Sequence, residues 1–316
     1  MGTNAAPPDD NGAAAPPFLL LNGHAKDLGG GFHVRRLLPA LQRRSIGPFV
    51  FFDHFGPVDV QPESEYDVRP HPHIGLATVT YLFDGAIMHR DSLGSAQEIA
   101  PGAINWMTAG RGIVHSERRP ERLRGRSYVN HGIQLWAALP SEHGETAPSF
   151  VHTPADAIPE VHDALGGRVR VLIGSAFGTT SPVATLSPTL YLDVQLPAGG
   201  ALPLPSLVPE MAIYAVEGAL RLEDSAGRAM AQPAGTLAVP LGDGPVRIQA
   251  ADGEGPVRCV VIGGAPLDGP RHIWWNFVSD RKERIVQAAD DWEAGRLGSV
   301  AGDPERIPLP ERHFKP

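Results

Sequence analysis

The sequence of 316 residues contains a single cysteine, Cys259. One cysteine cannot form a disulfide within the chain, so a disulfide-stabilised scaffold is excluded, and such a composition is typical of a reducing compartment. Cys259 lies in the strand-like apolar run 257–262, so we expect a buried, unreactive thiol. We therefore expect a cytoplasmic protein.

Basic clusters and long apolar segments are also missing from the sequence. The formal net charge is −8, and Lys and Arg do not gather in one stretch, which argues against direct binding to nucleic acid. No apolar run is long enough to cross a bilayer. Residues 1–17 lack the basic start and apolar centre of a signal peptide. We therefore expect neither a nucleic-acid partner nor a membrane partner.

Long helical stretches are few, whereas Gly (36) and Pro (32) are frequent. Short apolar segments alternate with turn pairs such as Asp84-Gly85 and Pro101-Gly102, a pattern typical of a sandwich or jelly-roll barrel. Segments after residue 165 weakly repeat those of the first half, which indicates duplication of one barrel. The sequence therefore predicts an all-β fold with two jelly-roll barrels in tandem.

One amphipathic helix is predicted near the C-terminal end. Asp280 and Glu283 form a start that resembles a capping box. An apolar stripe follows at helical spacing and predicts packing against a barrel; it consists of Ile285, Ala288, Ala289 and Trp292.

The composition also suggests where the domains begin and end. We expect residues 140–165 to be a linker. The predicted units are a disordered tail (1–16), an N-terminal metal-binding barrel (17–150), a C-terminal metal-free barrel (160–275), and a C-terminal helix and tail (276–316).

Two pairs of polar residues are the strongest candidates for a functional site. His71 and His73 are separated by one residue, and so are His115 and Glu117. Residues i and i+2 of a strand share a face, so each pair can point at one ion. One pair alone indicates ordinary strand histidines, but two pairs on facing strands of one barrel predict a metal site. The glycines at 110 and 112 fit a tight bend before the second pair.

Three imidazoles and one carboxylate suit Fe(II), Mn, Co, Ni, Cu or Zn and leave positions open for water or substrate. The second half differs, because it has no histidine between Asp163 and Arg271. Carboxylates alone favour Ca or Mg. We therefore expect the second barrel to be free of a catalytic metal.

Four other polar residues are weaker candidates. Asp53 and His54 follow an apolar run, and we favour a turn cap over a place at the rim of a pocket. His131 and Gln134 precede Leu135 on a predicted strand, and at a spacing of three they do not share a face. We expect neither His131 nor Gln134 to be a metal ligand.

Three motifs together resemble the pirin family of the cupin superfamily: HPHIG at 71–75, WMTAGRGIVHSE at 106–117 and HGIQLW at 131–136. The resemblance is clear over residues 20–150 and looser to about residue 275. It implies two cupin domains, of which only the N-terminal one binds metal. One departure is the pair at 77–78, Ala and Thr, where many cupins place a glutamate.

The resemblance implies that His71, His73, His115 and Glu117 hold one divalent transition metal. It makes Fe(II) the first expectation, with Zn, Mn, Co, Ni and Cu as alternatives. Many pirins are similar to quercetin 2,3-dioxygenases, which cleave flavonols with dioxygen and release carbon monoxide. In that reading, Glu117 takes the proton of the flavonol 3-hydroxyl. Trp106 and Met107 could line the substrate pocket or equally belong to the core.

Other pirins are similar to regulators without enzymatic activity. For this chain, the alternative is therefore an iron-containing, redox-sensing regulator that acts through contact with a protein partner. A metal-dependent isomerase of a sugar phosphate is a third possibility for a cupin, but no phosphate-binding motif favours it.

Overall fold

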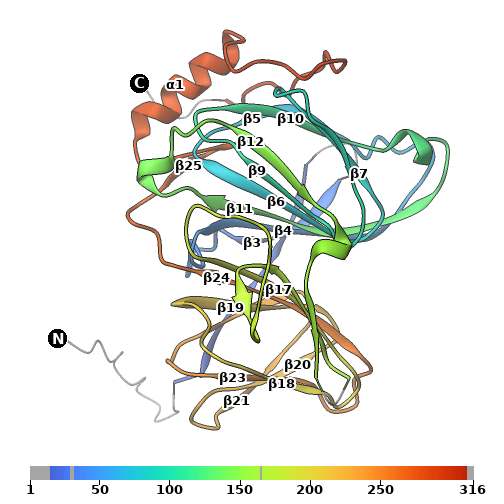
Figure 1. The fold of residues 1–316 in the computed structure, drawn as a ribbon, viewed down its shortest axis with the longest axis vertical. Helices are drawn as coiled ribbons and strands as arrows, with labels where there is room; N and C mark the ends of the chain where they lie inside the picture. The colour runs from blue at the N-terminus through green and yellow to red at the C-terminus, as the bar shows by residue number, and fades with distance from the viewer. Residues whose placement is uncertain (1–14, 29–31, 164–165, 312–316) are drawn as a thin grey trace.

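The computed structural model describes residues 15–28, 32–163 and 166–311. Figure 1 shows two β-barrels, one above the other, with the only α-helix of these residues at the end formed by the N-terminal barrel. The prediction of an all-β fold with two barrels and a C-terminal helix is confirmed. Most of the predicted N-terminal tail, residues 1–14, lies outside the described residues.

The N-terminal barrel consists of a seven-stranded and a four-stranded antiparallel sheet. In order across the larger sheet, the strands are β12 (Ser149–Thr153), β9 (Ile104–Thr108), β6 (Leu76–Asp84), β11 (Tyr128–Ala138), β4 (Phe49–Val60), β3 (His33–Leu38) and β2 (His24–Asp27). Across the smaller sheet they are β5 (Val68–His73), β10 (Ile113–Arg118), β7 (Ile87–Asp91) and β8 (Ala96–Ile99).

The C-terminal barrel repeats this arrangement of seven strands against four. Its larger sheet contains β1 (Phe18–Asn22), β22 (Thr236–Pro240), β19 (Glu210–Glu217), β24 (Val257–Gly264), β17 (Thr189–Leu196), β14 (Arg168–Ile173) and β13 (Glu160–His162). Its smaller sheet contains β18 (Ala201–Leu204), β23 (Val246–Ala250), β20 (Leu220–Glu223) and β21 (Ala229–Gln232). Cys259 is buried in β24, as predicted.

Short elements connect and cover the barrels. They are β15 (Ser175–Ala176), β16 (Thr179–Thr180), β25 (His272–Trp274), β26 (Phe277–Ser279), α1 (Lys282–Glu293), and 3-10 turns at Glu121–Leu123, Ser141–His143 and Ala155–Ala157. Within the parts of the chain that the structure covers, no helix is long and apolar enough to span a bilayer.

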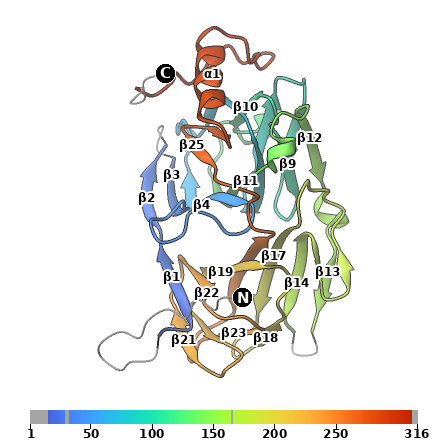
Figure 2. The same cartoon turned by 90° about the vertical axis from the view of Figure 1, so that its left-hand side faces the viewer.

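The first described strand belongs to the second barrel. Strand β1 pairs along its whole length with β22, with Leu20 opposite Ala238, and Figure 2 shows it among the C-terminal strands. The predicted boundary at residue 17, which places this strand in the N-terminal barrel, is therefore wrong for β1. A strand's own residues predict that it pairs but do not specify its partner.

The predicted linker 140–165 is also partly structured. It contributes edge strands to both barrels, because β12 pairs with β9 and β13 pairs with β14. The prolines that interrupt this segment all lie outside these short strands, where no ladder hydrogen bond is required of them.

Helix α1 covers the N-terminal barrel, although it follows the C-terminal one in sequence (Figure 1). Its predicted apolar stripe is buried, as expected, against Ile74, Val114 and Phe277. The predicted capping box is absent, because the helix begins at Lys282 and the residue at its N-cap is Arg281. Asp280 therefore lies one residue too early to cap the first turn.

The two larger sheets share one hydrophobic core, to which both barrels contribute aromatic rings such as Phe52 and Tyr214. A polar contact also crosses this interface. Asp193 of β17 accepts a hydrogen bond of 2.7 Å from the hydroxyl of Tyr81 on β6 and two, of 2.9 and 2.6 Å, from Arg258 on β24. The second barrel thus supports the sheet that forms one wall of the first.

Candidate metal centre

The two predicted pairs of polar residues lie on neighbouring strands. Strand β5 pairs with β10, and His71 stands directly opposite His115. The expectation of facing strands is therefore corrected to adjacent, hydrogen-bonded strands of the smaller sheet. Before β10 the chain bends, as predicted, with positive φ angles at Gly110 and Gly112. At Gly110 a side chain would meet the Thr146 carbonyl oxygen at 2.0 Å, so only glycine fits.

Three imidazoles converge on one point. His71, His73 and His115 are buried, and each offers a nitrogen that lies within 4.8 Å of the other two. The Nδ1 atom of His71 lies 2.8 Å from the Arg69 carbonyl oxygen, and that of His73 lies 3.1 Å from the Asn276 carbonyl oxygen. A carbonyl can only accept, so both Nδ1 atoms carry the hydrogen and both Nε2 atoms keep a free lone pair.

The charge state of these rings fits metal binding. Burial lowers the pKa of His71 to about 4 and holds the pKa values of His73 and His115 well below the ordinary value. The rings are therefore neutral at physiological pH, which is the form that ligates metal. The Nε2 atom of His115 is buried without a hydrogen-bond partner. The three histidines could thus hold a transition metal ion.

A fourth histidine stands behind this group. His89 of β7 approaches His115 with 3.4 Å between the two Nδ1 atoms, and its Nε2 atom donates to Asp91 at 3.0 Å. Asp91 is fixed by the backbone N–H groups of Leu93 and Ser95, at 2.9 and 3.0 Å. Because Asp91 takes the Nε2 hydrogen of His89, the Nδ1 atom of His89 can accept from His115, which leaves the Nε2 atom of His115 free.

Glu117 lies beside the three-histidine group but is not part of it in this structure. Its Oε1 atom is 3.5 Å from the hydroxyl of Thr80, whereas that hydroxyl is 2.9 Å from Oε1 of Gln134. Thr80 has one hydroxyl hydrogen, so the shorter bond to Gln134 takes it. Burial raises the pKa of Glu117 to about 7, and the distant Thr80 hydroxyl has only a smaller, opposing effect.

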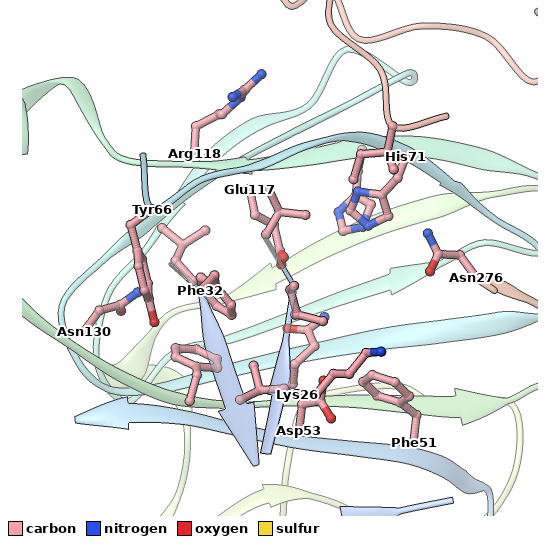
Figure 3. A pocket seen from close by; sticks show the side chains of 18 of the residues that line it. Lys26, Phe32, Phe51, Asp53, Tyr66, His71, Glu117, Arg118, Asn130 and Asn276 are labelled. Carbon is pink, nitrogen blue, oxygen red and sulfur yellow. The ribbon is translucent and has the colours of Figure 1, made fainter. Parts of the chain in front are cut away.

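A pocket of about 400 Å³ opens beside these groups, between the two sheets of the N-terminal barrel. Figure 3 shows His71 and Glu117 pointing into it from one side, with Phe51 and Asp53 across from them. Phe51 stacks on Trp136 with 3.9 Å between ring centres, and Arg36 lies over the other face of Phe51. Both faces of Phe51 are therefore covered, and the aromatic pair lines the pocket close to His73, which Trp136 contacts with 5.1 Å between ring centres.

The weaker candidates are placed differently from the predictions. Asp53 is not a turn cap, because β4 continues to Val60; the carboxylate binds Arg36 and lines the pocket. His54 points to the opposite face and hydrogen-bonds His131 and Tyr214 between the barrels. Of the alternatives for Trp106 and Met107, core packing is confirmed, since neither lines the pocket.

Several site residues were not predicted. Gln134 and Trp136 line the pocket two residues apart on β11, and their spacing on one strand face was a usable signal. The spacing of His89 and Asp91 repeats that of the ligand pairs and was another. By contrast, Trp275 and Asn276 reach the pocket of the N-terminal barrel from the predicted boundary between the C-terminal barrel and the C-terminal helix. Nothing in their local sequence indicates this position.

Comparison with known proteins gives a consistent family. Residues 31–137 match the pirin family, and residues 191–298 match the pirin C-terminal cupin domain. A pirin-like protein of Caulobacter vibrioides is 44% identical over 296 residues, covering 93% of this chain and 99% of that protein. A Pseudomonas aeruginosa protein provisionally named quercetin 2,3-dioxygenase is 39% identical over 291 residues, which cover 89% of this chain and 87% of that protein.

A solved structure supports the same assignment. The crystal structure of quercetin 2,3-dioxygenase from Acinetobacter baumannii superimposes with a TM-score of 0.83 and 32% identity, covering 94% of this chain and 96% of that one. Both barrels and the segments that cover them are thus shared over nearly the whole length. The chain therefore belongs to the pirin family, and its two barrels are cupin domains.

Proposed function

We propose that this pirin is a metal-dependent dioxygenase that opens the ring of a flavonol such as quercetin and releases carbon monoxide. In this proposal His71, His73, His115 and Glu117 hold one divalent metal, with Fe(II) as the favoured ion. Similarity to proteins named quercetin 2,3-dioxygenase supports the reaction. The grouping of three neutral histidines supports a borderline transition metal over Ca or Mg.

The observation that carries the proposal is the position of Glu117. Its carboxylate and the three imidazoles line one pocket that is also lined by the stacked rings of Phe51 and Trp136. In the metal-free protein, burial raises the pKa of Glu117 to about 7, and a carboxylate within reach of a substrate hydroxyl can act as its proton acceptor. A flat phenolic substrate placed against Phe51 and Trp136 would present its acidic hydroxyl to this base.

Each part of the pocket then has a chemical role. Glu117 takes the proton of the flavonol 3-hydroxyl, which makes the ring electron-rich; such a base contributes about 10²–10⁴-fold to a rate. The apolar rings of Phe51 and Trp136 exclude water from the reacting end of the substrate. When bound, the metal supplies the redox chemistry that lets dioxygen react with a closed-shell organic molecule.

The test is turnover measured together with metal content. Protein loaded anaerobically with Fe(II) and then exposed to dioxygen should consume one dioxygen and one flavonol for each carbon monoxide released. The loss of flavonol is followed by its absorbance, and the rate should be proportional to the amount of bound metal. His71→Ala should lose both metal and turnover, whereas His33→Ala, at an exposed position on β3, should keep both. Full metal occupancy without turnover, combined with capture of a partner protein, would instead support the alternative function of a redox-sensing regulator without enzymatic activity.

A further inference from the structure

The pocket contains unpaired polar atoms at two separate places. Among the described residues, seven buried side-chain N or O atoms have no hydrogen-bond partner. Three of the seven belong to residues that line this one pocket: His115 Nε2, Tyr66 Oη and Asn130 Oδ1. Unpaired buried polar atoms are rare in proteins, so those that line one cavity are completed by what fills it, water or a ligand. His115 belongs to the candidate metal centre, whereas Tyr66 and Asn130 have no role there.

Tyr66 and Asn130 lie at the end of the pocket away from the histidines. Figure 3 shows both at one end, His71 at the other and Glu117 between them. The register of β11 agrees, because Trp136 contacts His73 with 5.1 Å between ring centres and Asn130 lies six residues earlier on the same strand. The distance to the proposed base is shorter, because Gln134, which shares the Thr80 hydroxyl with Glu117, lies four residues from Asn130, and four residues of extended strand span about 13 Å.

The surroundings of Tyr66 offer its hydroxyl no partner. The side chain is only 7% exposed and belongs to an apolar cluster with Phe32, Phe55 and Ile87. Its ring lies 4.3 Å from that of Phe32. These contacts hold the phenol ring in place through its carbon atoms alone. The hydroxyl donor of Tyr66 and the carboxamide of Asn130, which is 1% exposed, are therefore available to a molecule in the pocket.

We propose that Tyr66 and Asn130 form a subsite for a hydroxyl group at the end of the substrate remote from the metal. A hydroxyl can donate one hydrogen bond and accept another, which matches an amide oxygen and a phenolic O–H together. The pocket would therefore select flat aromatic substrates that carry a second hydroxyl far from the reacting one. The inference rests on the proposed flavonol substrate and adds a specificity determinant to it.

The experiment measures anaerobic binding, by fluorescence quenching of the metal-loaded protein, for three compounds. They are 3-hydroxyflavone, 3,7-dihydroxyflavone and 3,4′-dihydroxyflavone, which differ only in the remote hydroxyl. The unchanged protein should bind at least one dihydroxy compound about tenfold more tightly than 3-hydroxyflavone, the effect of one added hydrogen bond in a buried site. Tyr66→Phe should abolish this preference while leaving the affinity for 3-hydroxyflavone unchanged.

Tyr128→Phe is the matched control, because Tyr128 also lines the pocket but its hydroxyl accepts a hydrogen bond from Arg119. This variant should keep the preference. Tyr66→Phe should also leave the thermal midpoint of the metal-free protein equal or higher, since it removes only an unpaired hydroxyl.

A preference retained in Tyr66→Phe, or no binding of any of the three compounds, would overturn the subsite. If the protein turns over flavonols but does not prefer the dihydroxy compounds, the subsite is overturned and the dioxygenase proposal stands. If it binds the dihydroxy compounds preferentially but turns none of them over, the dioxygenase proposal is overturned and the subsite stands.

Discussion

At the scale of single residues, the site depends on burying one carboxyl group among neutral imidazoles. Water would stabilise the charged form of Glu117, and the protein interior does not, so its pKa rises to about 7. The same burial lowers the pKa of His71 to about 4. One physical cause thus keeps the nitrogen ligands free of protons and makes the carboxylate a base near neutral pH.

The raised pKa of Glu117 predicts how stability changes with pH. In the metal-free protein the folded state keeps this proton up to pH of about 7, whereas the unfolded chain releases it near 4.5. Stability is therefore lost as pH rises between these values, by about 3 kcal/mol in total. We expect Glu117→Gln to be more stable than the unchanged protein by up to that amount at pH 8, and by almost nothing at pH 4.

Urea denaturation in the presence of a chelator, at several pH values, measures this difference. The histidines contribute equally in both proteins and cancel in the comparison. A stability difference that stays constant from pH 4 to pH 8 would show that Glu117 is not a buried carboxylate with a raised pKa. The same variant, loaded with metal, should lose turnover more steeply than metal affinity.

At the scale of elements, three neighbouring strands act together. Strand β5 carries two histidines, β10 carries the third, and β7 carries His89, which links His115 to Asp91. In the antiparallel register Asp91 stands opposite His115 and His89 stands opposite Glu117, so the place of the ring behind His115 is set by backbone hydrogen bonds rather than by a flexible loop. Figure 1 shows these strands side by side.

Loss of the hydrogen bond behind His115 should weaken metal binding. His89→Phe keeps a ring that can stack on Phe150, as His89 does with 4.1 Å between ring centres, but it cannot accept from His115. We expect metal affinity to fall by about 10–100-fold, measured by competition with a fluorescent chelator. The thermal midpoint of the metal-free variant should fall, because Asp91 and the Nδ1 atom of His115 each lose a buried hydrogen-bond partner; affinities are therefore compared at a temperature at which both variants are folded. His162→Phe, at an exposed position on β13, should keep full affinity, and equal affinities in both variants would contradict the role of His89.

At the scale of the whole molecule, a segment near each end of the chain packs on the barrel that is formed mainly by the other half of the sequence. Strand β1 completes the C-terminal sheet, whereas the segment from β25 through α1 covers the N-terminal barrel and brings Asn276 to His73. The C-terminal barrel therefore takes one strand from a distant part of the sequence, and the N-terminal barrel takes its cover from one. The core between the barrels includes a buried ion pair of Arg258 and Asp193, whose side chain is fully buried.

The ion pair predicts a large effect of one substitution. Asp193→Ala would leave the guanidinium of Arg258 without its carboxylate in the interior and remove the acceptor of Tyr81. We expect the free energy of unfolding to fall by about 3–5 kcal/mol, measured by urea denaturation. Glu223→Ala removes the exposed pair with Arg221 and should cost no more than about 1 kcal/mol. Similar costs for both variants would contradict the structural importance of the interface.

The sequence alone predicted the features that depend on local pattern. Alternation along strands placed His71 and His73 on one face, and the count of histidines separated a candidate metal barrel from one in which no transition metal is expected; that absence remains a prediction. Helical spacing predicted the apolar face of α1. These rules work because the direction of a side chain within one strand or helix is fixed by neighbouring residues.

Tertiary structure decided which distant segments meet. The partner of β1, the pocket positions of Trp275 and Asn276, and the separation of Tyr66 from the histidines all depend on packing between residues far apart in the chain. Asp53 was misplaced for the same reason, since its burial comes from Arg36 on another strand. The direction of a side chain within its strand is a local property, whereas what it contacts depends on the balance of burial and hydrogen bonding over the whole fold.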